Sequence, residues 1–165
     1  MADLKVTIRE ELTLNGYDQG AKNTLTISDI DEVFKRIVTC PANNETTIAR
    51  FRSSVGNASG TATFDSALDV QDVKYARVTN LDSSNSLTLS LQVEVGEDDS
   101  GADTSTSLLV ESGKSFMLSS PHDGIGAVAS GSYNANLVTD LVDVDSLVVQ
   151  PGSNSVDVEV YVASA

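Results

Sequence analysis

The fold is decided by residues 87–95, LTLSLQVEV, where a hydrophobic side chain alternates with a polar one at every position. Successive side chains of a β-strand point to opposite faces, so this spacing predicts a strand with one buried face. Residues 156–162, VDVEVYV, show the same pattern near the end of the chain. We therefore expect a protein built from strands that bury their hydrophobic faces in a common core.

The N-terminal region predicts a first hairpin. Residues 4–14 alternate as a half-buried strand would, and residues 25–27 form the returning strand. The turn between them, residues 15–20, contains Gly and Asn, which adopt positive φ angles readily. The alternation is interrupted at Glu10-Glu11, which predicts a β-bulge in this strand.

Two further hairpins are predicted in the middle of the chain. Residues 75–79 and 87–95 form the first, joined by the turn sequence NLDSSN at residues 80–85. Residues 108–111 and 115–118 form the second, around the turn Ser112-Gly113. Short polar connectors between alternating strands are the usual signal for antiparallel pairing.

The remaining segments complete an all-β protein. We expect strands at residues 33–40, 46–52 and 137–149, and long loops at residues 53–62 and 121–136. About eight to ten antiparallel strands without a long helical stripe predict a β-sandwich, and this number of strands suits a jelly roll. The chain length predicts one domain, residues 1–165.

Composition supports strands and excludes several classes of function. The chain has 20 Val, 22 Ser and 14 Thr but no Trp, one His and one Cys. Valine and threonine are β-branched and favour strands. A single Cys and a single His exclude a disulfide within the monomer, most sulfur-ligated metal sites and most histidine-based catalysis. Cys40 is expected to be a small, reduced core residue.

The charge is strongly negative and unevenly distributed. The net charge is −14, made of −2 up to Arg77 and −12 from Val78 onward. Such a chain repels nucleic-acid phosphates and anionic lipid headgroups, so we expect neither nucleic acid nor membrane as a partner. Residues 1–5 lead straight into alternating sequence, which predicts no secretory signal and synthesis in a cytoplasm. The near-neutral first half could carry a contact surface, although a generally acidic, solubilising surface is the simpler interpretation.

Two groups of carboxylates have the ligand type that Ca²⁺ accepts. The first is Asp98, Asp99 and Asp103, and the second is Asp140, Asp143 and Asp145. Neither group has the spacing of a known calcium loop, and solvated acidic loops are more common. We therefore predict no metal site and no cofactor.

Two other motifs lack the context that their chemistry needs. Gly124, Gly126 and Ala129 have the outline of a dinucleotide-binding loop, but the segment before them is a turn and not a buried parallel strand. His122 beside Asp123 has no serine elbow, so a surface histidine is the better interpretation. Paired carboxylates from distant strands stay open as a glycosidase site, but aromatic sugar platforms are scarce. The sequence predicts a protein that is not an enzyme.

Four segments together resemble small virion structural proteins of tailed bacteriophages, particularly marine phages. They are KVTIREELTLN at residues 5–15, TLTISDIDEVFKRIVTCP at residues 24–41, YARVTNLD at residues 75–82 and LVESGKSFMLSSP at residues 109–121. The chain departs from the usual pattern at Ser112, where such proteins often have Pro, and in the acidic residues 96–104. The resemblance implies a β-sandwich that is packed in many copies in a particle and has no catalytic activity.

Within that class the resemblance implies a capsid cement or decoration protein. It would be made in the host cytoplasm and located in the virion, bound to the major capsid protein and to itself as a homotrimer or homodimer. Self-association would use exposed sheet edges. The residues predicted to contact the capsid are in the first half of the chain: Leu4, Val6, Ile8, Arg9, Arg50 and Arg52.

Two alternatives use the same fold. The first is a structural component of the phage neck or tail. The second is a carbohydrate- or receptor-binding β-sandwich, in which Asp98, Asp99 and Asp103 hold Ca²⁺ and residues 124–131 touch sugar.

Overall fold

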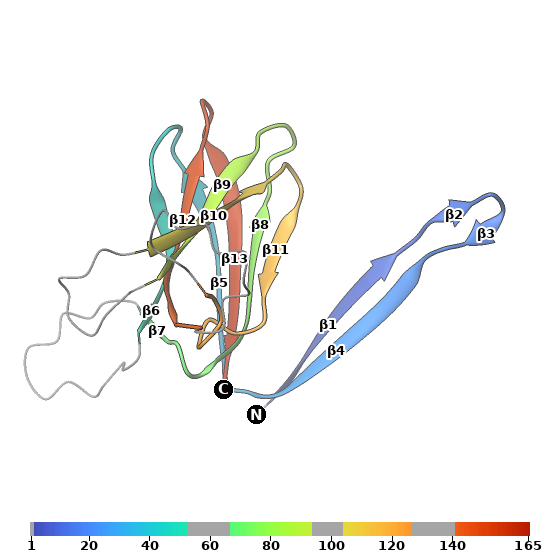
Figure 1. The fold of residues 1–165 in the computed structure, drawn as a ribbon, viewed down its shortest axis with the longest axis horizontal. Coiled ribbons are helices and arrows are strands. Elements are labelled where there is room, and N and C mark those ends of the chain that lie inside the picture. The colour runs from blue at the N-terminus through green and yellow to red at the C-terminus, as the bar shows by residue number, and fades with distance from the viewer. Residues whose placement is uncertain (1, 53–66, 94–103, 127–140) are drawn as a thin grey trace, which may run out of the picture.

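The computed structural model describes residues 2–52, 67–93, 104–126 and 141–165, and every regular element in these ranges is a β-strand. The prediction of an all-β fold is therefore confirmed. Nine of the strands form two sheets that pack face to face (Figure 1). They are β5 (Glu32–Cys40), β6 (Thr46–Arg52), β7 (Leu68–Asp69), β8 (Val73–Asn80), β9 (Leu87–Val93), β10 (Thr104–Val110), β11 (Ser115–Leu118), β12 (Val144–Pro151) and β13 (Val156–Ser164).

The two sheets have five and four strands. Their orders are β10-β9-β12-β6-β7 and β11-β8-β13-β5, and every pair is antiparallel except β6–β7. The core between them comes from the alternating residues of these strands. In β9, for example, Leu87, Leu89, Leu91 and Val93 are all buried, as their spacing predicts.

The prediction of two central hairpins is wrong, because β8 does not pair with β9 and β10 does not pair with β11. Strand β8 pairs with β13 and β11, and β9 pairs with β12 and β10. The connectors after β5, β8, β10 and β12 each carry the chain from one sheet to the other, so they are β-arches and not hairpin turns. An arch and a hairpin both need a short polar turn between alternating strands, so the sequence pattern does not distinguish them. The finer prediction of a jelly roll stays a prediction, and this alternation between sheets agrees with it.

One buried polar side chain holds two of these arches together. Asn80 is fully buried at the end of β8, yet all of its side-chain hydrogen-bonding groups have partners. Its Nδ2 donates to the carbonyl oxygens of Asn85 at 2.8 Å and Val110 at 3.1 Å, and its Oδ1 accepts from the backbone N–H of Asp82 at 3.0 Å. Its backbone also bonds to Gly113 and Lys114 in the next arch. The motif RVTNLD thus has a structural reason in this fold.

A β-bulge changes which residues of β6 face the core. Ala49 pairs with Leu147 and Thr47 pairs with Val148, so Ile48 is an extra residue in the ladder. As a result Ile48 and Ala49 are both buried, although they are adjacent in sequence. Arg50 is exposed, and it does not share a face with Ile48 as strict alternation predicts.

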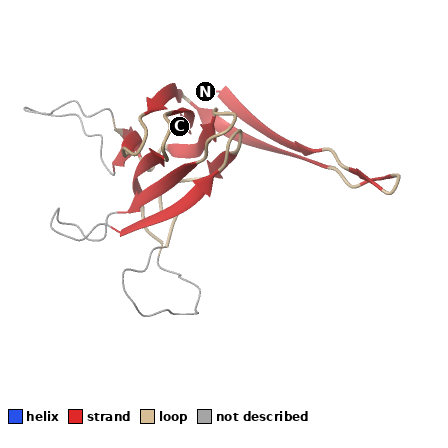
Figure 2. Ribbon diagram, turned by 90° about the horizontal axis from the view of Figure 1, so that it is seen from above, coloured by secondary structure: helices blue, strands red, loops and turns tan. Residues whose placement is uncertain are grey.

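The N-terminal strands lie outside the sandwich. β1 (Ala2–Glu10) and β4 (Ala21–Ile30) form a two-stranded antiparallel ribbon, and the short strands β2 (Thr13–Leu14) and β3 (Tyr17–Asp18) continue it to a turn. We call residues 2–30 the arm. It projects from the end of the sandwich where the chain ends, opposite the arches (Figures 1 and 2). The predicted first hairpin is therefore confirmed, but most of it is exposed and not half-buried.

Two backbone features shape the arm. Asn15 and Gly16 have φ values of 53° and 81° at the tip, as a tight hairpin turn requires. At the base, Ser28 and Asp29 stand opposite Asp3 alone, and Asp29 has a φ of 63°. This bulge lies at the base of the arm and not at Glu10-Glu11, where the sequence predicts one. Bulges bend and twist a strand, so the bulge accounts for the change of direction between the arm and β5.

Candidate interaction surface

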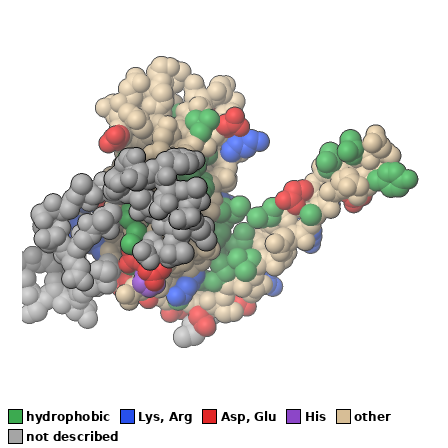
Figure 3. All heavy atoms as spheres, viewed as in Figure 1, with side chains coloured by type: hydrophobic (Ala, Val, Ile, Leu, Met, Phe, Trp, Pro, Cys, Tyr) green, Lys and Arg blue, Asp and Glu red, His purple; other side chains and the backbone are tan. Residues whose placement is uncertain are grey.

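The arm has one hydrophobic face and one polar face. Its register places Leu4 opposite Ile27 and Val6 opposite Leu25, and Ile8 follows on the same face. The other face pairs positively charged residues and threonines: Lys5 with Thr26, Thr7 with Thr24 and Arg9 with Lys22. The hydrophobic side chains continue from the base of the arm toward its tip (Figure 3). This face is hydrophobic at the base of the arm and again toward its tip, and it is interrupted by Asn23, opposite Ile8, and by Glu10.

The base of this hydrophobic face packs on the outer surface of the four-stranded sheet. Ile30, Tyr75 and Ala163 are buried there, and Leu4, Val6, Ile27 and Tyr161 pack against them. Tyr75 and Tyr161 meet edge to face, with ring centroids 6.2 Å apart. The chain leaves the arm through a backbone hydrogen bond from Asp31 N–H to the Ser164 carbonyl oxygen at 3.0 Å. These contacts fix the base of the arm on the sandwich.

The outer part of the arm lacks such cover. Five of the eleven large hydrophobic side chains that are exposed in the described part of the chain belong to the arm. They are Ile8, Leu12, Leu14, Tyr17 and Leu25, with exposed fractions of 41, 54, 56, 72 and 52%. Single exposed hydrophobic residues are ordinary, but several on one projecting ribbon mark a surface for binding.

The six predicted contact residues fall on two separate surfaces. Leu4 and Val6 are half-buried at the base of the arm, whereas Ile8 and Arg9 lie further out and are exposed. Arg50 and Arg52 are exposed on β6, in the five-stranded sheet. The arm packs on the other sheet, through β8 and β13. The structure therefore brings Leu4, Val6 and Ile8 together on the hydrophobic face of the arm, places Arg9 on its polar face, and leaves Arg50 and Arg52 on the opposite layer of the sandwich. Contact with a capsid stays a prediction for all six.

The strand predicted to contact the capsid extends to Leu14, but the contact residues named within it do not include the tip of the arm. Leu12, Leu14 and Tyr17 are more exposed than any of the predicted hydrophobic arm residues. The available signal is Leu14-Asn15-Gly16-Tyr17, a tight turn flanked by two large hydrophobic residues. An Asn-Gly turn places its flanking residues directly opposite each other.

An ion-pair network lies beside the base of the arm. Glu159 on β13 contacts Arg77 on β8 and Lys35 on β5, the latter at 3.2 Å. The Arg77 guanidinium lies 5.7 Å from the centre of the Tyr161 ring. Desolvation raises the pKa of Glu159, but hydrogen bonds and attraction from Lys35 and Arg77 outweigh it and lower the pKa below its usual value. The network ties three strands of the sheet that carries the arm.

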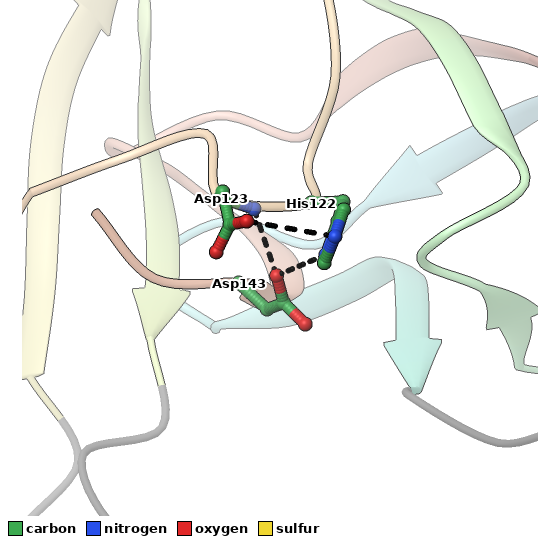
Figure 4. Close-up of side chains that lie close together, drawn as sticks. All are labelled: His122, Asp123 and Asp143. Atoms are coloured by element: carbon green, nitrogen blue, oxygen red, sulfur yellow. Dashed lines mark hydrogen bonds and ion pairs between the residues drawn. The ribbon is translucent and has the colours of Figure 1, made fainter.

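One group of titratable side chains comes together from two segments. His122 Nδ1 lies 2.8 Å from Asp143 Oδ1, and His122 Nε2 lies 3.5 Å from Asp123 Oδ2 (Figure 4). The same Asp143 oxygen accepts the backbone N–H of Asp123 at 2.8 Å. The side chains of His122, Asp123 and Asp143 are 42, 65 and 36% exposed. Asp143 thus fastens the turn after β11 to the start of β12, and this arrangement accounts for the group without a ligand.

Most residues of the other candidate motifs lie outside the described part of the chain. Asp98, Asp99, Asp103, Asp140 and Ala129 lie outside the described residues, so the predicted calcium and sugar contacts there are not addressed. Asp143 lies just before β12 and Asp145 is the second residue of that strand, near a strand start as the sequence predicts.

The prediction that Cys40 is a core residue is confirmed. Cys40 is fully buried at the end of β5. Burial raises the pKa of its thiol, so the reactive thiolate form is disfavoured.

Comparison with known proteins leaves the family open. No protein-family model matches the sequence, and no curated protein or solved structure matches it either. The described part of the chain contains no helix long and hydrophobic enough to cross a membrane.

Proposed function

We propose that the protein is a non-enzymatic structural subunit that binds neighbouring proteins in an assembly through its arm. The observation that carries this proposal is the row of exposed hydrophobic side chains on a ribbon that projects away from its own sandwich. An isolated two-stranded hairpin is marginal in water, so a partner that covers the outer arm gains hydrophobic burial and stabilises the ribbon at the same time.

Within this class we propose a capsid cement or decoration protein that is located in the virion and binds the major capsid protein. The support is the sequence resemblance to small phage virion proteins, together with a scaffold that fits the role. The four β-arches link the two sheets at one end, and the arm leaves from the other (Figure 1). A rigid sandwich with one projecting ribbon suits a protein that must span the joint between two subunits of a lattice.

The exposed hydrophobic side chains of the arm favour binding when a partner covers them. Full burial of a large hydrophobic side chain contributes about 1.5–3 kcal/mol, and Leu14 and Tyr17 are 56 and 72% exposed, so covering both supplies about 2–4 kcal/mol before the costs of association. Repetition over a lattice strengthens binding. Each contact that forms holds the chain close to its next binding site and so raises the effective concentration for the next contact. The net negative charge of the chain favours the solubility of unbound copies.

The proposal is tested by binding to empty capsids of the virus that encodes the chain. We expect the native protein to sediment with the capsids and the variant Leu14→Ser/Tyr17→Ser to stay in the supernatant. Leu109→Ser is the matched control, because Leu109 is 63% exposed on β10 and does not belong to the arm. Equal binding of the native protein and the arm variant would contradict the role of the arm.

Imaging of the intact particle separates the capsid from the neck or tail. Many copies spread over the shell support a decoration protein. A few copies at one vertex, with the arm in contact with a ring of subunits, would instead support a neck or tail component. Absence of the chain from the particle would overturn the virion assignment.

A further inference from the structure

The edge of β1 that faces away from β4 is the feature of the arm that indicates most clearly what kind of partner it binds. Among the described residues, β1 pairs only with β4, so the backbone groups along its other edge have no strand beside them. The edge is nine residues long and carries no proline. Long, regular edges of this kind are templates for a further strand, and natural sheets usually shorten or block them.

The sequence of β1 is complementary to itself in the antiparallel direction. Antiparallel pairing centred on Val6 uses all nine residues of the strand. It places Asp3 opposite Arg9, with opposite charges, and it does so twice because of the two-fold symmetry. Leu4 then stands opposite Ile8, and Val6 stands opposite Val6 of the second copy. Opposite charges and branched hydrophobic residues are the cross-strand pairs that stabilise sheets.

The neighbouring registers are less favourable for a simple electrostatic reason. A shift of two residues in one direction places Lys5 opposite Lys5 of the second copy. A shift of two in the other direction places Lys5 opposite Arg9, again twice. Like charges directly opposite each other destabilise a strand pair. A shift by one residue turns the hydrophobic face of one strand to the polar side of the other.

The packing of the arm base favours the same arrangement. Leu4 and Val6 lie against the sandwich of their own chain, whereas Ile8 is 41% exposed. In the pairing centred on Val6, Ile8 of the second copy lies directly beside Leu4. The exposed end of each β1 therefore joins the hydrophobic cluster at the base of the other arm.

We propose that two copies of this chain associate through β1, by antiparallel pairing centred on Val6, to form a continuous four-stranded ribbon in the order β4-β1-β1-β4. The two-fold symmetry closes the interface, so the product is a dimer and not a filament. This deepens the proposed function, on which it rests, by assigning a second copy to the inner part of the arm and leaving Leu14 and Tyr17 at the tip for the lattice.

Charge reversal tests the register. Asp3→Arg alone and Arg9→Asp alone each convert two attractive cross-strand pairs into two repulsive ones, and we expect each variant to weaken dimerisation by about tenfold or more. The combined variant Asp3→Arg/Arg9→Asp restores the pairs and should recover the native dimerisation constant in sedimentation equilibrium. Single variants that dimerise as tightly as the native protein, or a double variant weaker than both, would overturn the register.

Cysteine cross-linking tests the same geometry by distance. We expect Val6→Cys to form a disulfide dimer on mild oxidation, and a mixture of Leu4→Cys and Ile8→Cys to form the mixed dimer. Leu4→Cys alone should not, because its two copies would be roughly 13 Å apart along the strands. The native chain is the control for Cys40, which is fully buried. Efficient cross-linking of Leu4→Cys alone would contradict the pairing.

The two proposals fail in different experiments. The dimerisation measurements use the purified chain without capsids. A monomeric protein that still binds capsids through Leu14 and Tyr17 overturns only the dimer. A dimer that does not bind capsids contradicts the proposed function and leaves the pairing of β1 in place.

Discussion

Replacement of Asn80 by alanine gives the sharpest test of the sandwich architecture. The substitution removes three hydrogen bonds from a fully buried position and leaves three backbone groups without their partner: the carbonyls of Asn85 and Val110 and the N–H of Asp82. A buried polar group that loses its partner costs about 1–3 kcal/mol. Because these groups border turns that relax in part, we take the lower end for each and expect a total loss of about 3 kcal/mol in the free energy of unfolding.

The assay is urea unfolding at a fixed protein concentration, with the slope of the transition compared between variants. Asn44→Ala is the matched control. Asn44 also lies in an arch, and its Nδ2 donates to the Ala42 carbonyl oxygen at 3.1 Å, but it is exposed. We expect this control to lie within about 0.5 kcal/mol of the native protein. If Asn80→Ala were equally mild, Asn80 would not hold the two arches together and the account of the motif RVTNLD would be wrong.

Two further predictions concern the arm and acid stability. A Cβ added at Gly20 would clash with the Glu10 carbonyl oxygen, so Gly20→Ala should speed amide exchange in β1 and β4 while the sandwich unfolds as before. Gly152→Ala is the control, because its added Cβ meets nothing within 4 Å, and it should change neither property. Equal amide exchange in the two variants would refute the close contact at Gly20. Hydrogen bonds from the backbone of Ser84 and Asn85 lower the pKa of Asp82 in the folded state, so this contribution is full above the unfolded pKa and is lost as the pH falls through the folded one. The free energy of unfolding of Asp82→Asn should therefore depend less steeply on pH in the acid range than that of the native protein, and parallel curves would contradict this.

The fold class follows from the sequence because alternation is a local property. Residues 87–93 face the core on one side whatever strand lies beside them, so β9 and its buried leucines are evident from spacing alone. Strand pairing is not local in this sense. The turn after β8 contains the same polar residues that a hairpin would contain, and the outcome depends on Asn80, whose partners include Val110, thirty residues further along the chain.

The candidate site is predicted in part for a related reason. Leu4, Val6 and Ile8 read as an ordinary core strand, because spacing reports which residues share a face but not whether the protein itself covers that face. The turn of direction at Asp29 separates the arm from the sandwich, and a single aspartate with positive φ leaves no periodic signal. The distinction between core strand and exposed ribbon therefore needs the three-dimensional structure.

The most direct test of the central claim is amide hydrogen exchange of residues 2–30 in the purified protein and in its native assembly. If the arm is the working surface, its amides exchange more slowly in the assembly than in the isolated protein, and the slowing extends from β1 to Leu14 and Tyr17 at the tip. Exchange at the arches, such as the amides of residues 81–86, should be the same in both. An arm that exchanges equally in the two states, with new protection on the sandwich instead, would contradict the account.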